Sequence, residues 1–206
     1  MFELLKAGGP FMYATLTVSL LSLAIFIWRI MVLWGPRAAR PALLHKVQEY
    51  LQGNDVTKAL RLVANDDSPL GRVMKAALMR ANRSEREIRR AVEGVALEEV
   101  PKVRGATVFL PQLSNLATLL GLIGTIHGLI IAFQGAGSEN AATRQAVLSK
   151  GISIAFYNTF FGLVVATISV VFYLILLART NAALALIEKS SSTVVDSILW
   201  YRDGSA

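Results

Sequence analysis

The 206-residue chain contains no cysteine and few charged residues. Without cysteine the chain has no disulfide, no thiolate metal site and no cysteine nucleophile, although this absence does not identify a compartment. Charged residues make up 17% of the sequence, against roughly 25% in an ordinary soluble domain, while 54% of the residues are hydrophobic. This composition argues against both a soluble globular domain and a disordered chain.

The sequence also lacks the common signatures of catalysis. It has no paired carboxylates within its apolar stretches, no Gly-x-Ser-x-Gly turn, no Walker phosphate-binding loop and no HExxH zinc motif. We therefore expect no enzymatic activity, no catalytic residue, no bound metal and no cofactor. The net charge of +7 is not gathered into a basic patch interleaved with aromatic residues, so we expect no nucleic-acid binding.

Three stretches are long enough to cross a bilayer, which needs about 20 apolar residues in a helix. They cover residues 7–27, 107–133 and 151–178, and the last two contain no Asp, Glu, Lys or Arg. A cleaved signal peptide is an alternative for the first stretch. Its apolar core exceeds the usual roughly 7–15 residues, and only Lys6 precedes it as a base, so we expect it to be a membrane helix. The predicted fold is all-α and integral to the membrane, with three transmembrane helices and long cytoplasmic helical extensions.

The distribution of basic residues predicts the orientation. Residues 35–106 carry 14 Lys and Arg, whereas the segment 134–150 carries only Arg144 and Lys150. The positive-inside rule places the basic segment in the cytoplasm, with the N-terminus and the 134–150 loop in the periplasm. The predicted parts are a periplasmic N-terminus and first span (1–34), a cytoplasmic helical domain (35–106), a second span (107–133), a periplasmic loop (134–150), a third span (151–178) and a cytoplasmic helical tail (179–206).

The cytoplasmic segments show helical periodicity. Apolar residues at Leu43, Leu44, Val47 and Leu51 fit one helix, and Ser84-Glu85-Arg86-Glu87 fits a capping box at the start of a later helix that leads almost continuously into the second span. The tail is amphipathic through Leu184, Ile187, Val194 and Ile198. We interpret the basic region as a solvated structural bundle rather than a binding site.

Small residues recur along one face of each charge-free span. In the second span they are Ala117, Gly121, Gly124, Gly128 and Ala132, and in the third span they are Ala155, Thr159, Gly162, Ala166 and Ser169. Such stripes let helix backbones approach closely in lipid, so we assign Gly121, Gly124, Gly128 and Gly162 to helix packing.

Polar residues accompany these stripes, and an amide such as Asn158 is costly in a span unless it faces protein or water. Matched polar faces suggest that the two spans line a shared interior. The candidate lining residues are Thr125, Thr159, Asn158, Ser153, Tyr157 and His127. Two alternatives remain open: a threonine can bond its own backbone carbonyl, and His127 can be an interface hydrogen-bonding group instead of a proton relay.

Neither charge-free span contains an acidic residue. A proton path needs a titratable group that can load and release a proton. If the chain conducts protons, the carboxylate must therefore come from another polypeptide.

Two segments together resemble a known family. LLGLIGTIHGLIIAF at 119–133 and GISIAFYNTFFGLVVA at 151–166 resemble the paired signatures of the MotA/TolQ/ExbB proton-channel family, and the three-span topology is similar to the TolQ/ExbB branch. The resemblance implies a homopentamer in the bacterial inner membrane around two copies of a single-span TolR/ExbD/MotB-like partner. That partner would supply the proton-binding aspartate, with Thr125 and Thr159 lining the route beside it.

One position departs from the pattern. TolQ and ExbB usually carry a glutamate in the third-span motif where this chain has Ile154, and MotA also lacks that glutamate. The implied function is a proton-channel subunit that converts proton-motive force into work on a cell-envelope machine, of the Tol/Exb type or in gliding motility. The alternatives are a non-conducting membrane scaffold and a self-contained ion channel.

Overall fold

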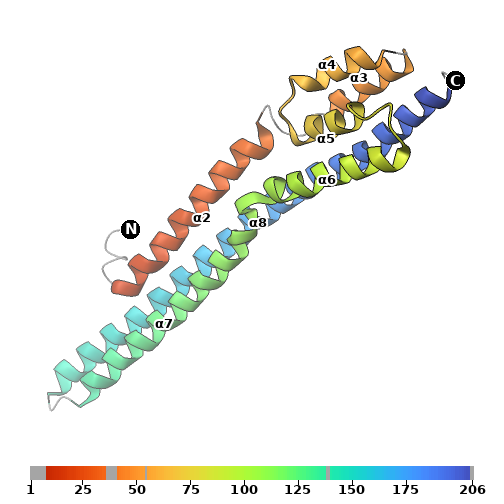
Figure 1. The fold of residues 1–206 in the computed structure, drawn as a ribbon. Helices are drawn as coiled ribbons and strands as arrows, with labels where there is room; N and C mark the ends of the chain where they lie inside the picture. The colour runs from red at the N-terminus through yellow and green to blue at the C-terminus, as the bar shows by residue number, and fades with distance from the viewer. Residues whose placement is uncertain (1–7, 36–40, 54, 138–139, 205–206) are drawn as a thin grey trace. The chain divides into compact units, whose positions relative to one another are not determined.

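The structure is a computed structural model that describes residues 8–35, 41–53, 55–137 and 140–204. Within these ranges it is helical and contains no strand, so the all-α prediction is confirmed. The helices are α2 (Pro10–Trp34), α3 (Pro41–Gln52), α4 (Val56–Ala64), α5 (Pro69–Leu78), α6 (Glu85–Arg104), the short 3-10 helix η1 (Gly105–Phe109), α7 (Leu110–Ala136) and α8 (Ala141–Gly204) (Figure 1).

Three helical segments are long and apolar enough to cross a membrane, as the sequence predicts. They are Pro10–Trp34, Glu85–Gly135 and Ala141–Arg202. Helix α8 already begins at Ala141, so much of the segment that we expect to be a periplasmic loop, 134–150, is helical. The reason is local: the Asn140 side chain accepts hydrogen bonds from the backbone N–H groups of Ala142 and Thr143 at 3.0 and 3.3 Å, which caps the start of α8.

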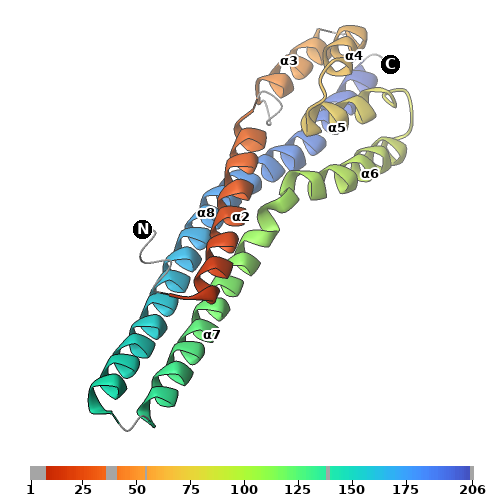
Figure 2. The same cartoon turned by 90° about the vertical axis from the view of Figure 1, so that its left-hand side faces the viewer.

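The fold divides into two compact units. The first comprises residues 1–28 and 106–176, and the second comprises residues 29–105 and 177–206. In the first unit, α7 and the first half of α8 run antiparallel and side by side in both views (Figures 1 and 2). Helix α2 joins them through a hydrogen bond of 2.7 Å between the Ser22 and Ser169 hydroxyls and through stacked rings of Phe26 and Phe172, whose centroids lie 3.9 Å apart.

The outward faces of the first unit are apolar. Ile126, Phe133, Phe156 and Phe160 are each at least 60% exposed. A soluble protein rarely shows so much contiguous apolar surface, so these faces fit lipid or further subunits.

The second unit has an ordinary helical core. Leu43, Leu44, Val47 and Leu51 of α3 are all buried, as their spacing predicts, and so are Ile187, Val194 and Ile198 of the α8 tail. They pack with side chains from α4, α5 and α6: Ala59, Val63, Leu70, Val73, Met74, Ala77, Ile88 and Val92. Burial of each large aliphatic side chain contributes about 1.5–3 kcal/mol, so this cluster holds the unit together.

Side-chain caps fix where the helices of the second unit begin. The Glu87 carboxylate accepts the backbone N–H of Ser84 at 3.1 Å and its hydroxyl at 2.7 Å, which confirms the predicted capping box. The Ser68 hydroxyl accepts the N–H of Gly71 at 3.0 Å at the start of α5. Pro69 follows that cap as the first helical residue, a position where its missing N–H costs nothing.

Helix α6 ends at Gly105, where the backbone conformation favours glycine. Gly105 has φ +45°, and a Cβ there would lie 2.6 Å from the Arg29 guanidinium. Arg29 is 2% exposed and donates to the carbonyl of Val103, which lies in the last turn of α6, where carbonyls lack helical partners. In the sequence, Trp28 and Arg29 directly follow the apolar stretch 7–27, a pattern typical of a membrane interface. The structure instead buries Arg29 as a cap. The helical run nevertheless continues from Glu85 to Gly135, so the predicted, almost continuous passage into the second span is present, with 3-10 geometry at Gly105–Phe109.

Candidate functional site

The small-residue stripes of α7 and α8 face each other. A Cβ on Gly128 would lie 2.5 Å from the backbone nitrogen of Ala155, and a Cβ on Gly162 would lie 2.8 Å from the carbonyl oxygen of Ala117. At Gly121 the nearest backbone atom, the Asn158 oxygen, would be 3.1 Å away, and at Gly124 a Cβ would collide with the Asn158 side chain. The glycines therefore allow two helix backbones to touch along their length.

Thr125 of α7 and Thr159 of α8 meet at the edge of this contact. Their hydroxyl groups are within hydrogen-bonding distance, and both residues are half-buried. The Thr125 hydroxyl also lies 3.1 Å from the carbonyl of Gly121 on its own helix and 3.4 Å from the carbonyl of Ala155 across the contact. The pair is thus a polar contact between α7 and α8, whose apolar stretches contain no charged residue.

Asn158 points into the first unit. It is 1% exposed, and its amide donates to the carbonyl of Gly8 at 2.6 Å and to that of Ile154 at 2.9 Å. Its Oδ1 has no partner among the described residues. The structure therefore separates Asn158 from an exposed channel surface and gives it a bond to the chain just before α2.

Ser153 and Tyr157 are exposed on α8. The Ser153 hydroxyl donates to the carbonyl of Ser149 on its own helix at 2.9 Å, which satisfies it locally. Tyr157 is 38% exposed, so its ring is available to whatever covers this face. These two residues do not join the Thr125–Thr159 pair.

His127 lies near the start of α2. Its ring meets the ring of Phe11 edge-on at 5.3 Å between centroids, and its Nδ1 is buried without a partner in the described part of the chain. His127 lines a cavity of about 630 Å³ together with Lys150, Ser153 and Ile154. Ile154, which stands where the family pattern usually has glutamate, is 7% exposed, so no carboxylate is available at this point.

Two polar contacts in this unit escape the sequence analysis. The Ser114 hydroxyl of α7 donates to the carbonyl of Ala166 at 3.0 Å, and Ser22 of α2 bonds Ser169. Each serine lies in an apolar stretch, and such hydroxyls often bond across helices in membranes. That signal alone does not name their partners.

Comparison with known proteins finds relatives over most of the chain. The model of the MotA/TolQ/ExbB proton channel family matches residues 65–189. A putative biopolymer transport protein, ExbB-like 3, from Synechocystis sp. is 29% identical over 190 residues, covering 91% of this chain and 90% of that protein.

Two further relatives come from other bacteria. The biopolymer transport protein exbB1 of Vibrio cholerae is 27% identical, covering 79% of this chain and 70% of its own. The Tol-Pal system protein TolQ of Pseudomonas aeruginosa is 25% identical, covering 66% of this chain and 65% of its own. The residues matched by the family model include both charge-free spans and the Thr125–Thr159 pair. The chain belongs to the MotA/TolQ/ExbB proton channel family and is a multi-pass protein of the inner membrane.

Proposed function

We propose that the chain is the channel subunit of a proton-driven motor whose proton-binding aspartate is supplied by a TolR/ExbD/MotB-like partner. The observation that carries this proposal is the Thr125–Thr159 pair, which joins two helices without a single charged residue in their apolar stretches. Hydroxyl groups can relay a proton but cannot store one at neutral pH, because they do not titrate there. The acid must therefore be contributed by the partner.

In this mechanism the proton-motive force drives protons past the partner aspartate along the threonine face. One elementary charge that moves through 100 mV releases about 2.3 kcal/mol. Protonation neutralises the aspartate, so that it can leave its polar site and the partner can move to the next subunit. A pentamer around two partner helices has mismatched symmetry, which turns successive steps into rotation. His127, Tyr157 and Ser153 line the edge of this route, while Asn158 holds the helices that form it.

The proposal includes the orientation of the chain in the membrane. The N-terminus and residues 134–150 face the periplasm, and residues 35–106 and 179–206 lie in the cytoplasm. The motor works on an envelope machine of the Tol/Exb type or on a gliding apparatus. The chain acts as a channel and has no enzymatic activity of its own.

The test is proton flux into liposomes that contain the chain with and without its partner. Thr125→Val and Thr159→Val keep the side-chain shape but remove the hydroxyl, so each is expected to reduce partner-dependent flux at least tenfold. Matched controls are Thr118→Val and Thr167→Val, because each of these hydroxyls donates to a carbonyl of its own helix, at 3.2 and 2.8 Å. The controls should retain flux.

The buried Ile154 favours one other function, a non-conducting scaffold, because an apolar residue there cannot exchange a proton. A complex that shows no partner-dependent flux, and that is unaffected by Thr159→Val, would be such a scaffold. Flux without any partner would instead identify a self-contained ion channel.

A further inference from the structure

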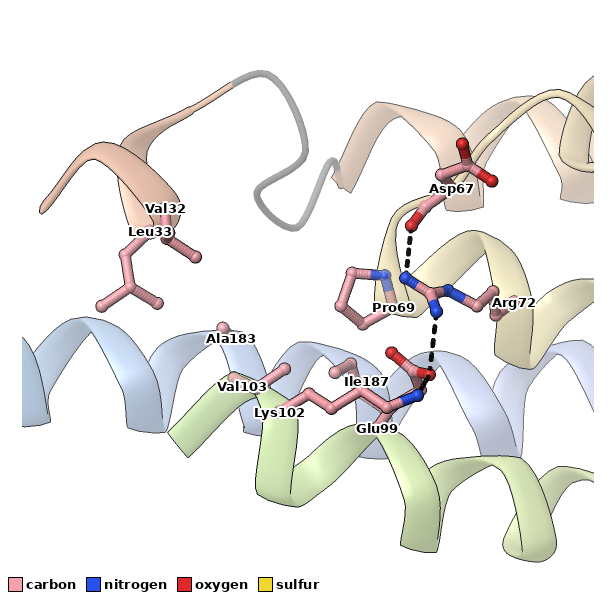
Figure 3. Close-up of a pocket in the computed structure, with 10 residues that line it drawn as sticks. All are labelled: Val32, Leu33, Asp67, Pro69, Arg72, Glu99, Lys102, Val103, Ala183 and Ile187. Carbon is pink, nitrogen blue, oxygen red and sulfur yellow. Dashed lines mark hydrogen bonds and ion pairs between the residues drawn. The ribbon is translucent and has the colours of Figure 1, made fainter. Parts of the chain in front are cut away.

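A cavity of about 200 Å³ lies within the second unit, beside the end of α2 (Figure 3). Most of its wall is apolar and comes from Val32 and Leu33 of α2 and from Ala183 and Ile187 of α8. A water molecule occupies about 30 Å³ in the liquid, so the space exceeds what a single water fills. Apolar walls bind water poorly, which favours an occupant with an apolar part.

One edge of the cavity is charged. Glu99 is 2% exposed, and its Oε1 accepts the Lys102 ammonium at 2.7 Å and pairs with the Arg72 guanidinium at 3.3 Å (Figure 3). Its Oε2 is buried and has no partner among the residues that the structure describes. Arg72 also donates to the backbone carbonyl of Asp67 at 2.9 Å, while the Asp67 carboxylate points away from the cavity.

Two cations thus face one carboxylate. The side chains of Arg72 and Lys102 are 46% and 56% exposed, so both can bind a further group. An ammonium has three donors and a guanidinium has five, and Glu99 and the Asp67 carbonyl occupy only some of them. The edge therefore carries a net positive charge and spare donors, which complement one anionic oxygen group.

The cavity lies where an apolar helix ends. Trp34 follows Leu33 directly, and the guanidinium of Arg179 lies 4.7 Å from the centroid of the Trp34 ring. Tryptophan is enriched at the membrane–water interface, and arginine near the end of a spanning helix extends its charge toward that interface. Part of the apolar wall thus comes from the last turn of a spanning helix, and the cations come from helices α5 and α6.

We propose that this cavity binds one phospholipid, with its phosphate at Arg72 and Lys102 and its first chain carbons against Val32 and Ile187. A phosphodiester supplies the single negative charge that the edge lacks, and guanidinium and ammonium groups are the usual phosphate ligands. In the orientation proposed above, the lipid belongs to the cytoplasmic leaflet. The inference does not depend on proton conduction.

The first test uses a substitution that fills the cavity. The full-length protein is purified in mild detergent, stripped of lipid and titrated with phosphatidylglycerol, and bound lipid is counted by native mass spectrometry. Ala183→Leu places a larger side chain in the cavity and is expected to weaken binding of one phospholipid per subunit at least tenfold. Ala185→Leu, on the exposed face of the same helix, is the matched control and should bind as the unsubstituted chain does. Equal binding by the two variants would overturn the proposal.

The second test asks whether the cations bind the phosphate group of the lipid. Lys102→Gln leaves Arg72 on Glu99 and is expected to weaken phosphatidylglycerol binding about tenfold, the loss of one hydrogen bond to a charged group. Lys58→Gln, an exposed lysine paired with Asp55 outside the cavity, should have no effect. Diacylglycerol, which has the chains but no phosphate, should bind at least tenfold more weakly than the phospholipid.

Two outcomes of the second test would overturn the lipid assignment. Equal affinity for diacylglycerol would show that the cations play no part, and displacement of the lipid by millimolar inorganic phosphate would show a site for free phosphate. Proton flux is measured separately, so failure here leaves the proposed function standing, and loss of flux leaves the lipid site standing.

Discussion

Asn158 shows how a single polar side chain can secure a membrane helix. Asn158→Ala removes the donor at 2.6 Å from the Gly8 carbonyl, so we expect the protein to lose about 1–2 kcal/mol of stability. Thermal unfolding in detergent, followed by circular dichroism, measures the change. Asn181→Ala, at an exposed position of the same helix, is the control and should leave the midpoint unchanged. An Asn158 variant of normal stability but altered ion selectivity would instead place this residue in the conduction path.

For single residues, the sequence shows which polar side chains are important, but it does not show which groups they bond. An amide in an apolar span must be satisfied by protein, so Asn158 stands out in the sequence. One of its two acceptors, however, is the carbonyl of Gly8, 150 residues away, and no local pattern encodes that pairing. Thr125 and Thr159 are recognised through their motifs, but their contact depends on the register between α7 and α8.

At the scale of whole helices, the contact between α7 and α8 depends on glycine residues. In Gly128→Ala the new methyl would lie 2.5 Å from a backbone nitrogen, so the helices must separate and stability should fall. Gly94→Ala is the matched control, because a Cβ at this exposed position of α6 meets nothing within 4 Å. There the exchange should raise stability by about 0.5–1 kcal/mol, the ordinary gain of alanine over glycine in a helix. Denaturant titration in detergent compares the two, and an increase in both would contradict the close packing.

The start of α6 should respond to acid. The hydroxyl and backbone N–H of Ser84 donate to the Glu87 carboxylate and hold its pKa below the usual value, with help from Arg83 and Arg80. A lowered pKa means that folding favours the ionised form, so the contribution is present at neutral pH and is lost as the pH falls through the folded-state pKa, below about pH 4.

Glu87→Gln keeps a side-chain oxygen for the cap but removes the titration. We expect the stability difference between the original chain and this variant to be constant above about pH 5 and to shrink below about pH 4. Unfolding midpoints across that range measure it. An equal slope in both proteins would show that the capping carboxylate contributes nothing through its charge.

The elements themselves follow closely from local signals, with one class of exception. The capping box at Ser84, the apolar periodicity of α3 and the amphipathic tail appear in the structure as the sequence predicts. The differences arise where a tertiary contact decides. The sequence around Arg29 predicts a base at the membrane interface. In the structure Arg29 instead caps the end of α6, because Gly105 leaves room for its guanidinium.

For the whole molecule, the composition and the three apolar stretches suffice to predict a helical membrane protein. The segment 134–150 is harder to predict, because its polar residues suit a loop as well as the first turns of a long helix, and only Asn140 starts α8 there. The number of subunits in a ring and the number of partner chains do not follow from the sequence of one chain. A stripe of small residues packs equally well within a subunit and between subunits.

The orientation of the whole chain can be tested directly, because it contains no native cysteine. Ala146→Cys and Ser192→Cys each introduce one thiol at an exposed position, the first before the third span and the second in the tail. The positive-inside rule predicts that residues 35–106, with their excess of Lys and Arg, stay in the cytoplasm. With that orientation, a membrane-impermeant maleimide should label the Ala146→Cys variant in intact spheroplasts. It should label the Ser192→Cys variant only after the membrane is opened. The reverse pattern would invert the topology, and with it the leaflet of the proposed lipid and the direction in which protons pass Thr125 and Thr159.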